Sequence, residues 1–435
     1  MRLKHTDVFT PNDFPAYSYV ARETEGLERK LQNALETPKT VISISGPSKA
    51  GKTVLIEKLV GPDNLITVSG AEIQEVSDLW DRILDRIEAP DTQVTTSGSI
   101  VGGEVAITGG GEIGVPLVVK GKASATAKAS GSKTNTTAST RQRRGLSDVE
   151  EALADTNFVV FIDDFHYIEK KLQIAVARQV KAAAGKGVRM VLAAVPHRAD
   201  DAVRSNSELR GRTAQVDVEF WSDIELEAIA KVGFRALGRS IAPTTAKRLA
   251  QEACGSPQLM QQICLQTCIE AKIYESRATD AAINLNDTVI ADGEIRAALQ
   301  NAAAQTDYTS LVRQMHSGPK TRGMERKEFK FKDGSKGDVY RAILLAIAAN
   351  PPASTISYSE LNKRVEAVCV GEWPGSGSVV QSLRHATNLV RGFQPEDRII
   401  EWEDTASGGV LTIVDPYLLF FLRSSDKLQQ LGRKI

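Results

Sequence analysis

One stretch near the amino end constrains the fold of this chain more than any other. Residues 46–53 read Gly-Pro-Ser-Lys-Ala-Gly-Lys-Thr and fit the pattern G-x-x-x-x-G-K-[ST] without a mismatch. An apolar, β-branched run at residues 41–45 precedes the pattern, and an apolar helical pattern at residues 54–59 follows it. This order of strand, loop and helix predicts a loop whose backbone N–H groups cradle phosphate oxygens, with the dipole of the helix facing the anion.

The side chains of the same loop complete a predicted nucleotide site. Lys52 is expected to reach the β- and γ-phosphates, and the hydroxyl group of Thr53 is expected to ligate Mg²⁺. The sequence therefore predicts that ATP and Mg²⁺ bind at Gly46, Pro47, Ser48, Lys49, Ala50, Gly51, Lys52 and Thr53.

A second chemical signal lies at residues 158–164, which read Phe-Val-Val-Phe-Ile-Asp-Asp. A wholly apolar strand that ends in two carboxylates is typical of a central parallel strand, which delivers acids to the carboxyl edge of a sheet. Asp163 is expected to hold Mg²⁺, directly or through water, opposite Thr53. With further apolar strands, the pattern predicts an α/β fold with a parallel five-stranded sheet, the other strands being at residues 41–45, 65–68, 188–195 and 216–220.

Composition limits the class of protein. The 435 residues carry no formal net charge, and 25% of them are charged, which is typical of a globular chain of two or three domains. No global field therefore draws the whole chain to nucleic acid or to anionic lipid. Without a leader segment or a run of about 18 apolar residues, we expect a cytoplasmic protein with no membrane span. The cysteines fall in apolar helical patterns and are expected to be buried and reduced: Cys254, Cys264, Cys268 and Cys369.

Two flanking motifs resemble those of a known family. Residues 19–25, Tyr-Val-Ala-Arg-Glu-Thr-Glu, are similar to the segment that precedes the phosphate loop in STAND ATPases, the signalling relatives of AAA+ origin-recognition ATPases. Ala21 stands where that family has Gly, and an ordinary charged helix start is the alternative. Gly255-Ser256-Pro257 resembles the G-x-P motif of the STAND lid. The resemblance implies a P-loop NTPase of the AAA+ type, with Arg22 near the nucleotide base and Pro257 coupling the bound nucleotide to a helical lid.

The same resemblance implies candidate catalytic residues. Asp164 stands where hydrolytic relatives carry a Glu that polarises the attacking water, and its shorter side chain predicts slow, regulated hydrolysis. His197 is a candidate sensor of the γ-phosphate, or else a satisfied surface residue. Arg210 or Arg212 takes the place of an arginine that reaches the nucleotide of a neighbouring subunit, surface arginines being the alternative. No Arg lies in the helix after Pro257, which favours a nucleotide-gated switch over a continuously cycling motor.

The carboxyl-terminal part has the element order of a winged helix. Helices are expected at 339–349, 358–368 and 378–390, and strands at 398–401 and 410–414. The third helix should turn an apolar face inward and present Gln381, Arg384, His385, Asn388 and Arg391 outward. Such a face can lie in a DNA major groove. In STAND relatives the winged helix folds back on the ATPase and latches it, and we favour this latch.

The predicted organisation has five parts: a P-loop ATPase core at 1–220, a helical lid at 221–300, a basic linker at 301–337, a winged helix at 338–424 and a tail at 425–435. A Gly/Ser/Thr-rich, hairpin-like insertion interrupts the core at 92–145, with strand character at 105–108 and 115–120 and a flexible basic end at 133–144. The insertion is expected either to pair edge to edge between subunits on assembly or to be a loop without a role.

Two functions remain. The first is a slowly hydrolysing, Mg²⁺-dependent ATPase that changes conformation or forms a homo-oligomer on ATP binding, as bacterial STAND relatives do in stress signalling and antiphage defence. That role requires a separate effector or sensor protein. The second is a DNA-binding AAA+ loader or transposition-type regulator that uses the winged helix. A metabolic kinase is less well supported, because no acceptor-substrate site is recognisable in the sequence.

Overall fold

The computed structural model describes residues 2–22, 26–88, 92–98, 136–142, 144–194, 213–276, 287–319, 325–393, 399–405 and 408–432. Its packing divides the chain into two compact units. The sheet unit comprises Leu27–Ser45 and Leu55–Asp217, and the loop–lid unit comprises Met1–Gly26, Gly46–Val54 and Val218–Ile435. The phosphate-loop segment thus packs with the carboxyl-terminal half of the chain. The division into five parts made from the sequence stays a prediction.

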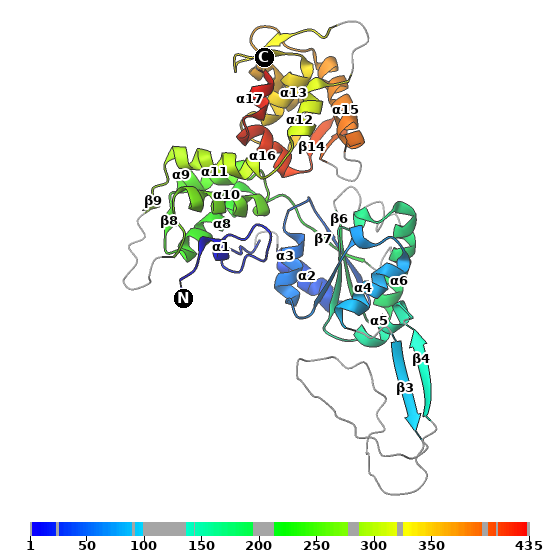
Figure 1. Ribbon diagram of the computed structural model, residues 1–435. Coiled ribbons are helices and arrows are strands. Elements are labelled where there is room, and N and C mark those ends of the chain that lie inside the picture. The colour runs from blue at the N-terminus through cyan, green and yellow to red at the C-terminus, as the bar shows by residue number, and fades with distance from the viewer. Residues whose placement is uncertain are drawn as a thin grey trace. The chain divides into compact units, whose positions relative to one another are not determined.

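The sheet unit is built on five parallel strands (Figure 1). In chain order they are β1 (Val41–Ser45), β2 (Leu65–Ser69), β5 (Val159–Asp163), β6 (Arg189–Ala194) and β7 (Thr213–Asp217). They lie in the order β2-β5-β6-β1-β7, and every neighbouring pair is parallel. The predicted parallel five-stranded sheet is therefore confirmed, although the last strand begins earlier than expected.

Helices cover both faces of this sheet, as continuous apolar strands require. On one face lie α2 (Leu27–Glu36) and α3 (Lys52–Val60), and on the other lie α4 (Val76–Arg86), α5 (Leu146–Leu153) and α6 (Lys170–Gly185) (Figure 1). Alternate strand residues, such as Val160 and Ile162, join the core under α4 to α6. The register sets Ser45 beside Ala194 and Ile162 beside Leu192, so the carboxyl ends of the central strands share one edge.

A helical lid forms part of the loop–lid unit. It contains α8 (Asp223–Ala236), α9 (Pro243–Glu252), α10 (Pro257–Glu270) and α11 (Asp292–Ala304), with the short parallel strands β8 (Ser240–Ile241) and β9 (Asp287–Thr288). Ser222 and Glu225 form a capping box at the start of α8, and Ser256 caps α10. Phe9, which follows α1 (His5–Val8), packs against Phe234 in the lid core.

The remaining helices and strands form a winged helix. Its elements are α12 (Thr309–Ser317), β10 (Phe329–Lys330), β11 (Lys336–Gly337), α13 (Val339–Ala348), β12 (Thr355–Ser357), α14 (Tyr358–Val368), α15 (Ser376–Phe393), β13 (Ile400–Glu403), β14 (Val410–Ile413), α16 (Pro416–Ser424) and α17 (Lys427–Gly432). The antiparallel sheet β12-β14-β13 closes it. The predicted winged helix is confirmed, and β12 is a strand that the sequence pattern missed.

Helices α15 and α16 differ in the surfaces that they expose and bury. The polar face of α15 is exposed as predicted, with Gln381, Arg384, His385, Asn388 and Arg391 outward. Helix α16 contributes to two cores: Tyr417 and Phe420 pack in the lid core, whereas Leu418 and Leu419 pack in the winged-helix core. Because one helix is built into both cores, the lid and the winged helix are joined by buried apolar contacts.

The insertion in the sheet unit contains the antiparallel pair β3 (Thr92–Gly98) and β4 (Thr136–Gln142), with Thr92 opposite Gln142. Residues 136–142, within the segment expected to be flexible at 133–144, pair with β3, and the flexibility of that segment stays a prediction. The strands expected at 105–108 and 115–120 lie outside the described residues. Among the described helices, none is both long enough and apolar enough to cross a membrane.

Candidate nucleotide-binding site

The phosphate-loop motif forms a tight turn between β1 and α3. Lys49 and Gly51 adopt left-handed backbone conformations, with φ of 62° and 90°. A Cβ atom on Gly46 would lie 2.6 Å from the carbonyl oxygen of Val218, so a larger residue does not fit there. The two glycines of the motif therefore serve the close approach and the curl that a phosphate cradle requires.

Lys52 is the first residue of α3, and its side chain lies inside the loop. The residue is buried, and its Nζ atom donates to the carbonyl oxygens of Gly46 at 3.0 Å and Pro47 at 2.8 Å. The ammonium group is thus held at the amino end of a helix, where anions are favoured. This arrangement fits a phosphate ligand, because the cation and the helix end attract the same charge.

The lid holds the outer arm of the loop through its backbone. Ser256 donates from Oγ to the carbonyl oxygen of Lys49 at 3.2 Å, and Trp221 donates from Nε1 to the carbonyl oxygen of Ala50 at 3.1 Å. Pro257 Cγ lies 3.8 Å from the position that a Cβ on Gly51 would take. The Gly255-Ser256-Pro257 motif is therefore next to the phosphate loop, and the coupling of Pro257 to the bound nucleotide stays a prediction.

Arg22 is buried and bound to the start of the lid. Its guanidinium donates to the carbonyl oxygen of Glu219 at 2.9 Å, pairs with Glu225 at 3.1 Å and lies over the Trp221 ring. Burial raises the pKa of the Glu225 carboxyl, but hydrogen bonds from Ser222 and the nearby Arg22 bring that pKa below its usual range. Arg22 thus fixes the segment that supplies Trp221 to the loop. Its expected position near the nucleotide base stays a prediction.

The carboxyl-terminal domain also binds the loop, through a contact that sequence reasoning missed. Lys49 Nζ lies 3.3 Å from both carboxylate oxygens of Asp415 and 4.1 Å from the centre of the Tyr417 ring. Asp415 is the N-cap of α16, accepts a hydrogen bond from the Tyr417 amide at 2.9 Å and accepts another from the Tyr308 hydroxyl. We call Lys49, Asp415, Tyr308 and Tyr417 the α16 latch.

The two acids of the second motif lie at the carboxyl end of β5 in the sheet unit. Asp163 ends the strand and accepts a hydrogen bond from the backbone amide of Asp164 at 2.9 Å. Asp164 has a left-handed φ of 51°, and its side chain is half-exposed, with His166 Nδ1 at 4.0 Å. This conformation follows from the sharp turn into the short helix Phe165–Tyr167. The pairing of Asp163 with Thr53 around Mg²⁺ stays a prediction.

The described residues contain no cluster of three or more His, Cys, Asp or Glu side chains that could hold a metal by themselves. The other candidate catalytic residues, His197, Arg210 and Arg212, lie outside the described residues. Their roles also stay predictions.

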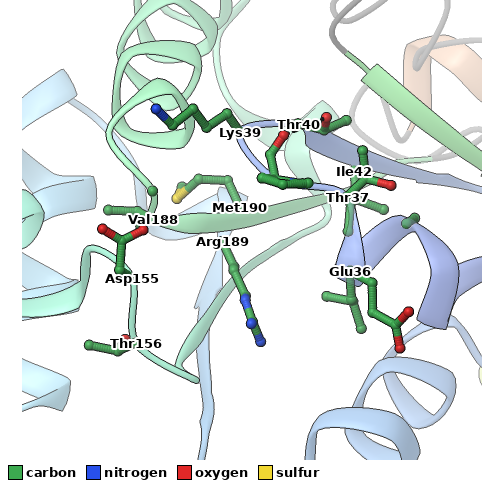
Figure 2. Close-up of a pocket in the computed structure, with 14 residues that line it drawn as sticks. Glu36, Thr37, Lys39, Thr40, Ile42, Asp155, Thr156, Val188, Arg189 and Met190 are labelled. Atoms are coloured by element: carbon green, nitrogen blue, oxygen red, sulfur yellow. Dashed lines mark hydrogen bonds between the residues drawn. The ribbon is translucent and has the colours of Figure 1, made fainter.

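A separate cavity of about 250 Å³ lies at the amino-terminal edge of the sheet (Figure 2). Ile42 of β1 and Met190 of β6 line it, together with Lys39 and Asp155 from neighbouring turns. Open α/β sheets bind ligands at the carboxyl ends of their strands. The phosphate loop follows the carboxyl end of β1, whereas this cavity lies at the amino ends of the strands. The cavity is therefore distinct from the candidate nucleotide-binding site.

No protein-family model matches the sequence, and no curated protein matches it. Solved structures that resemble the chain include Cdc6p from Pyrobaculum aerophilum, at 12% identity over 100% of both chains with a TM-score of 0.42. The ORC2 protein of Aeropyrum pernix in its ADPNP–ADP complexes is 13% identical over 99% of each chain, with a TM-score of 0.47. A Walker-type ATPase of Pyrococcus abyssi is 13% identical over 96% of this chain and 97% of that one, with a TM-score of 0.47.

Because these identities and TM-scores are low, the class of the fold is argued from the chain's own sheet order and loop geometry. The order β2-β5-β6-β1-β7, the phosphate loop after β1, the helical lid and the terminal winged helix make this an α/β P-loop fold of the AAA+ type. The sheet, the phosphate loop and the winged helix that the sequence predicted are therefore confirmed.

Proposed function

We propose that the chain is a slow, Mg²⁺-dependent ATPase whose nucleotide state is read by the lid and the winged helix. One observation supports this proposal above all: Lys49 of the phosphate loop is bound by both of those parts, and the lid also binds the adjacent Ala50. Ser256 and Trp221 of the lid hold the carbonyl oxygens of Lys49 and Ala50, and Asp415 of the closing helix holds the Lys49 side chain. A change in the loop on nucleotide binding therefore alters contacts of both parts.

The chain's own residues suit this chemistry. Lys52 and the loop amides would hold the phosphates, while Thr53 and Asp163 would hold Mg²⁺. Bound Mg²⁺ neutralises charge that develops on the phosphate oxygens during transfer. Asp164 would orient the attacking water, and its short side chain supports slow hydrolysis.

The α16 latch supplies the switch. Lys49 and Asp415 are 31% and 16% exposed, which lies between a solvent-exposed pair and a buried one. Removing the charge of one partner should cost about 1–2 kcal/mol, since exposed pairs contribute up to about 1 and breaking a buried pair costs about 3–5. Triphosphate in the loop adds negative charge that competes with Asp415 for Lys49. Nucleotide binding should therefore weaken the hold of α16 on the loop.

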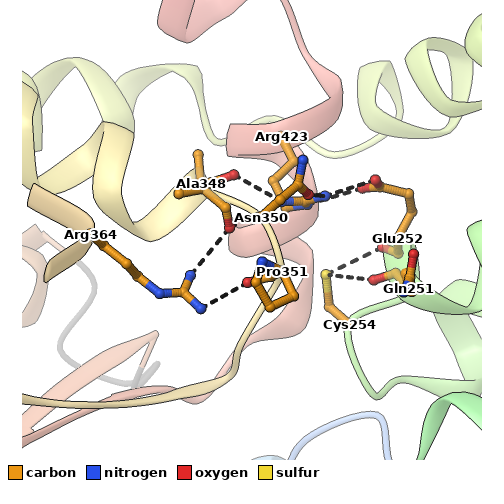
Figure 3. Close-up of polar contacts among 9 residues, drawn as sticks. Gln251, Glu252, Cys254, Ala348, Asn350, Pro351, Arg364 and Arg423 are labelled. Carbon is orange, nitrogen blue, oxygen red and sulfur yellow. Dashed lines mark hydrogen bonds and ion pairs between the residues drawn. The ribbon is translucent and has the colours of Figure 1, made fainter. Parts of the chain in front are cut away.

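The lid and the winged helix should respond together. Arg423 of α16 pairs with Glu252 of α9 through two contacts of 2.8 and 3.0 Å, and it donates to the carbonyl oxygen of Ala348 at 2.8 Å (Figure 3). The Arg423 side chain is only 7% exposed. This buried pair adds to the shared apolar contacts of α16. We infer that the lid and the winged helix shift as one body against the loop.

The assembly roles expected from the family belong to the same proposal. ATP binding would favour a homo-oligomer in which Arg210 or Arg212 reaches the nucleotide of the next subunit, and the output would pass to a separate effector or sensor, as in stress signalling or antiphage defence. Sizing the protein with ADP and then with a nonhydrolysable ATP analogue tests this idea. A larger species with the analogue, and hydrolysis per subunit that rises with protein concentration, are the expected results.

Removal of the insertion is a second test of assembly. Replacing residues 95–142 with a short Gly/Ser linker should leave ATP binding intact and keep the protein monomeric if the hairpin pairs between subunits. Assembly equal to that of the unaltered chain would exclude this role. Constant activity at all protein concentrations, unaffected by substitution of Arg210 and Arg212, would leave those residues as surface charges.

A DNA-binding loader is the second candidate, and the exposed face of α15 favours it. Gln, Asn and Arg side chains on such a helix are the types that read base edges in a major groove. Arg384, however, is paired with Asp404 of β13–β14 at 2.6 Å, so part of this face is already engaged. The nucleotide switch therefore stays the primary proposal.

A further inference from the structure

The β10–β11 hairpin carries lysines on its outward face. Lys330 and Lys336 are direct partners in the antiparallel register, so their side chains project from the same face. Lys332 follows two residues on and is also exposed, whereas the alternate residues Phe329 and Phe331 are buried in the winged-helix core. Like charges directly opposite each other destabilise a strand pair. An external anion would remove that cost.

Acids close to these lysines in the chain are already engaged, and Glu328, which precedes Lys330 by two residues, also has a partner. Asp333, in the hairpin turn, pairs with the buried Arg341 at 2.9 Å, and Glu372 pairs with Lys327 at 2.7 Å. Within the described part of the chain, Lys330, Lys332 and Lys336 form no ion pair. Their three positive charges therefore remain available to a partner.

The hairpin is attached to the turn that leads into α15. The amide of Val370 donates to the carbonyl oxygen of Lys330 at 2.8 Å, and the amide of Lys332 donates to the carbonyl oxygen of Val368 at 2.9 Å. Trp373, in the same turn, is 50% exposed. The lysines are thus fixed by backbone hydrogen bonds near the amino end of the helix whose polar face is exposed.

The β13–β14 hairpin, which is the wing of the winged helix, carries negative charge where the β10–β11 hairpin carries positive charge. Glu403 and Asp404 are exposed at the end of β13, and Asp404 binds Arg384 of α15. A DNA backbone is therefore disfavoured at the described part of the wing and favoured at the hairpin. An acidic protein segment would also suit lysines, but the exposed Gln, Asn and Arg side chains on the adjoining helix favour duplex DNA.

We propose that Lys330, Lys332 and Lys336 form a docking surface for the phosphate backbone of duplex DNA, in place of the acidic wing. The lysines position the duplex without reading its sequence, because phosphate contacts carry no base information. Lys330 and Lys336 oppose each other across the hairpin and Lys332 lies in its turn, so the three charges are grouped at one end of the hairpin. This surface acts independently of the nucleotide switch.

The test is fluorescence anisotropy of a labelled, mixed-sequence 30-base-pair duplex, about 100 Å long, with the full chain over a range of salt concentrations. The triple variant Lys330→Gln, Lys332→Gln, Lys336→Gln should bind the duplex on the order of 100-fold more weakly at 0.1 M salt. The slope of log K against log salt should decrease by about 3, since each phosphate contact contributes about 0.9. Affinity for ATP should be unchanged, which separates this result from the nucleotide proposal.

The matched control removes three exposed lysines from the sheet unit, at Lys170, Lys171 and Lys186. This variant loses the same total charge and should bind the duplex within a few-fold of the unaltered chain. Asp404→Asn should bind at least as tightly. Equal weakening by both triple variants, no duplex binding by the unaltered chain, or a polyglutamate peptide bound through the same lysines when DNA is not, would each overturn the proposal. Circular dichroism shows that each variant is folded.

Discussion

Substitution of Asp415 by Asn tests the α16 latch with little change in shape. Asn is as good an N-cap as Asp, so it can still accept the hydrogen bond from the Tyr417 amide at 2.9 Å. Its amide oxygen can also accept from the Tyr308 hydroxyl. The variant therefore removes mainly the negative charge that holds Lys49.

The expected size of the effect follows from the exposure of this ion pair. A loss of about 1 kcal/mol in the latched state changes the ratio of latched to released protein about fivefold. If the released form binds ATP and the latched form dominates, the apparent Kd for ATP should fall by up to about fivefold. Competition with a fluorescent ATP analogue measures this change.

Asp338→Asn is the matched control. Asp338 caps α13, accepts from the Tyr340 amide at 2.9 Å and pairs with Arg326 at 2.8 Å, and its side chain is 19% exposed against 16% for Asp415. It makes the same kinds of contact but is not bound to the phosphate loop. An ATP affinity of Asp415→Asn within twofold of the unaltered chain, or a change equal to that of Asp338→Asn, would refute the latch.

Four further predictions follow from the same contacts. Lys52→Ala should weaken ATP binding about 10- to 100-fold by calorimetry, because a charge-assisted contact is lost; unchanged binding would remove the site assignment. Asp164→Asn should retain ATP but slow single-turnover phosphate release on the order of 100-fold, and a normal rate would show that another group orients the water. Arg423→Met should lower the free energy of unfolding in urea by about 3 kcal/mol, since Glu252 is left partly buried without its partner; an unaltered midpoint would contradict this. Burial raises the pKa of the Cys268 thiol to about 12, so above pH about 8.5 the folded state keeps this proton while the unfolded state loses it. The free energy of unfolding should therefore fall by up to about 1.4 kcal/mol per pH unit between pH about 8.5 and about 12. The variant Cys268→Ala should show a smaller fall over the same range.

Much of the fold could be predicted because its signals are local. Apolar runs such as that before Asp163 are long enough to indicate buried parallel strands, and the phosphate-loop motif fixes where one strand must end and a helix begin. The helical spacing in α15 likewise separates the inward Leu383 from the outward Arg384. All four cysteines are buried thiols, as the apolar patterns around them predicted.

The other features depend on contacts between distant segments or on very short elements. Lys49 and Asp415 are 366 residues apart, and nothing in either local sequence indicates that they meet. The three-residue strand β12 is too short to show a period of two. The opposed Lys330 and Lys336 looked like a solvated basic linker, because only the register of the hairpin reveals that their charges face each other.

Hydrogen–deuterium exchange at the start of α16 tests nucleotide gating most directly. The amides of Tyr417 and Leu418 are bonded to Asp415, so their protection reports whether the latch is closed. Saturation with Mg²⁺ and a nonhydrolysable ATP analogue should protect residues 46–53 and speed exchange at residues 416–419, and Lys52→Ala should abolish both changes. Protection of the loop with unchanged exchange at residues 416–419 would show that the nucleotide binds without releasing α16, and would contradict the switch.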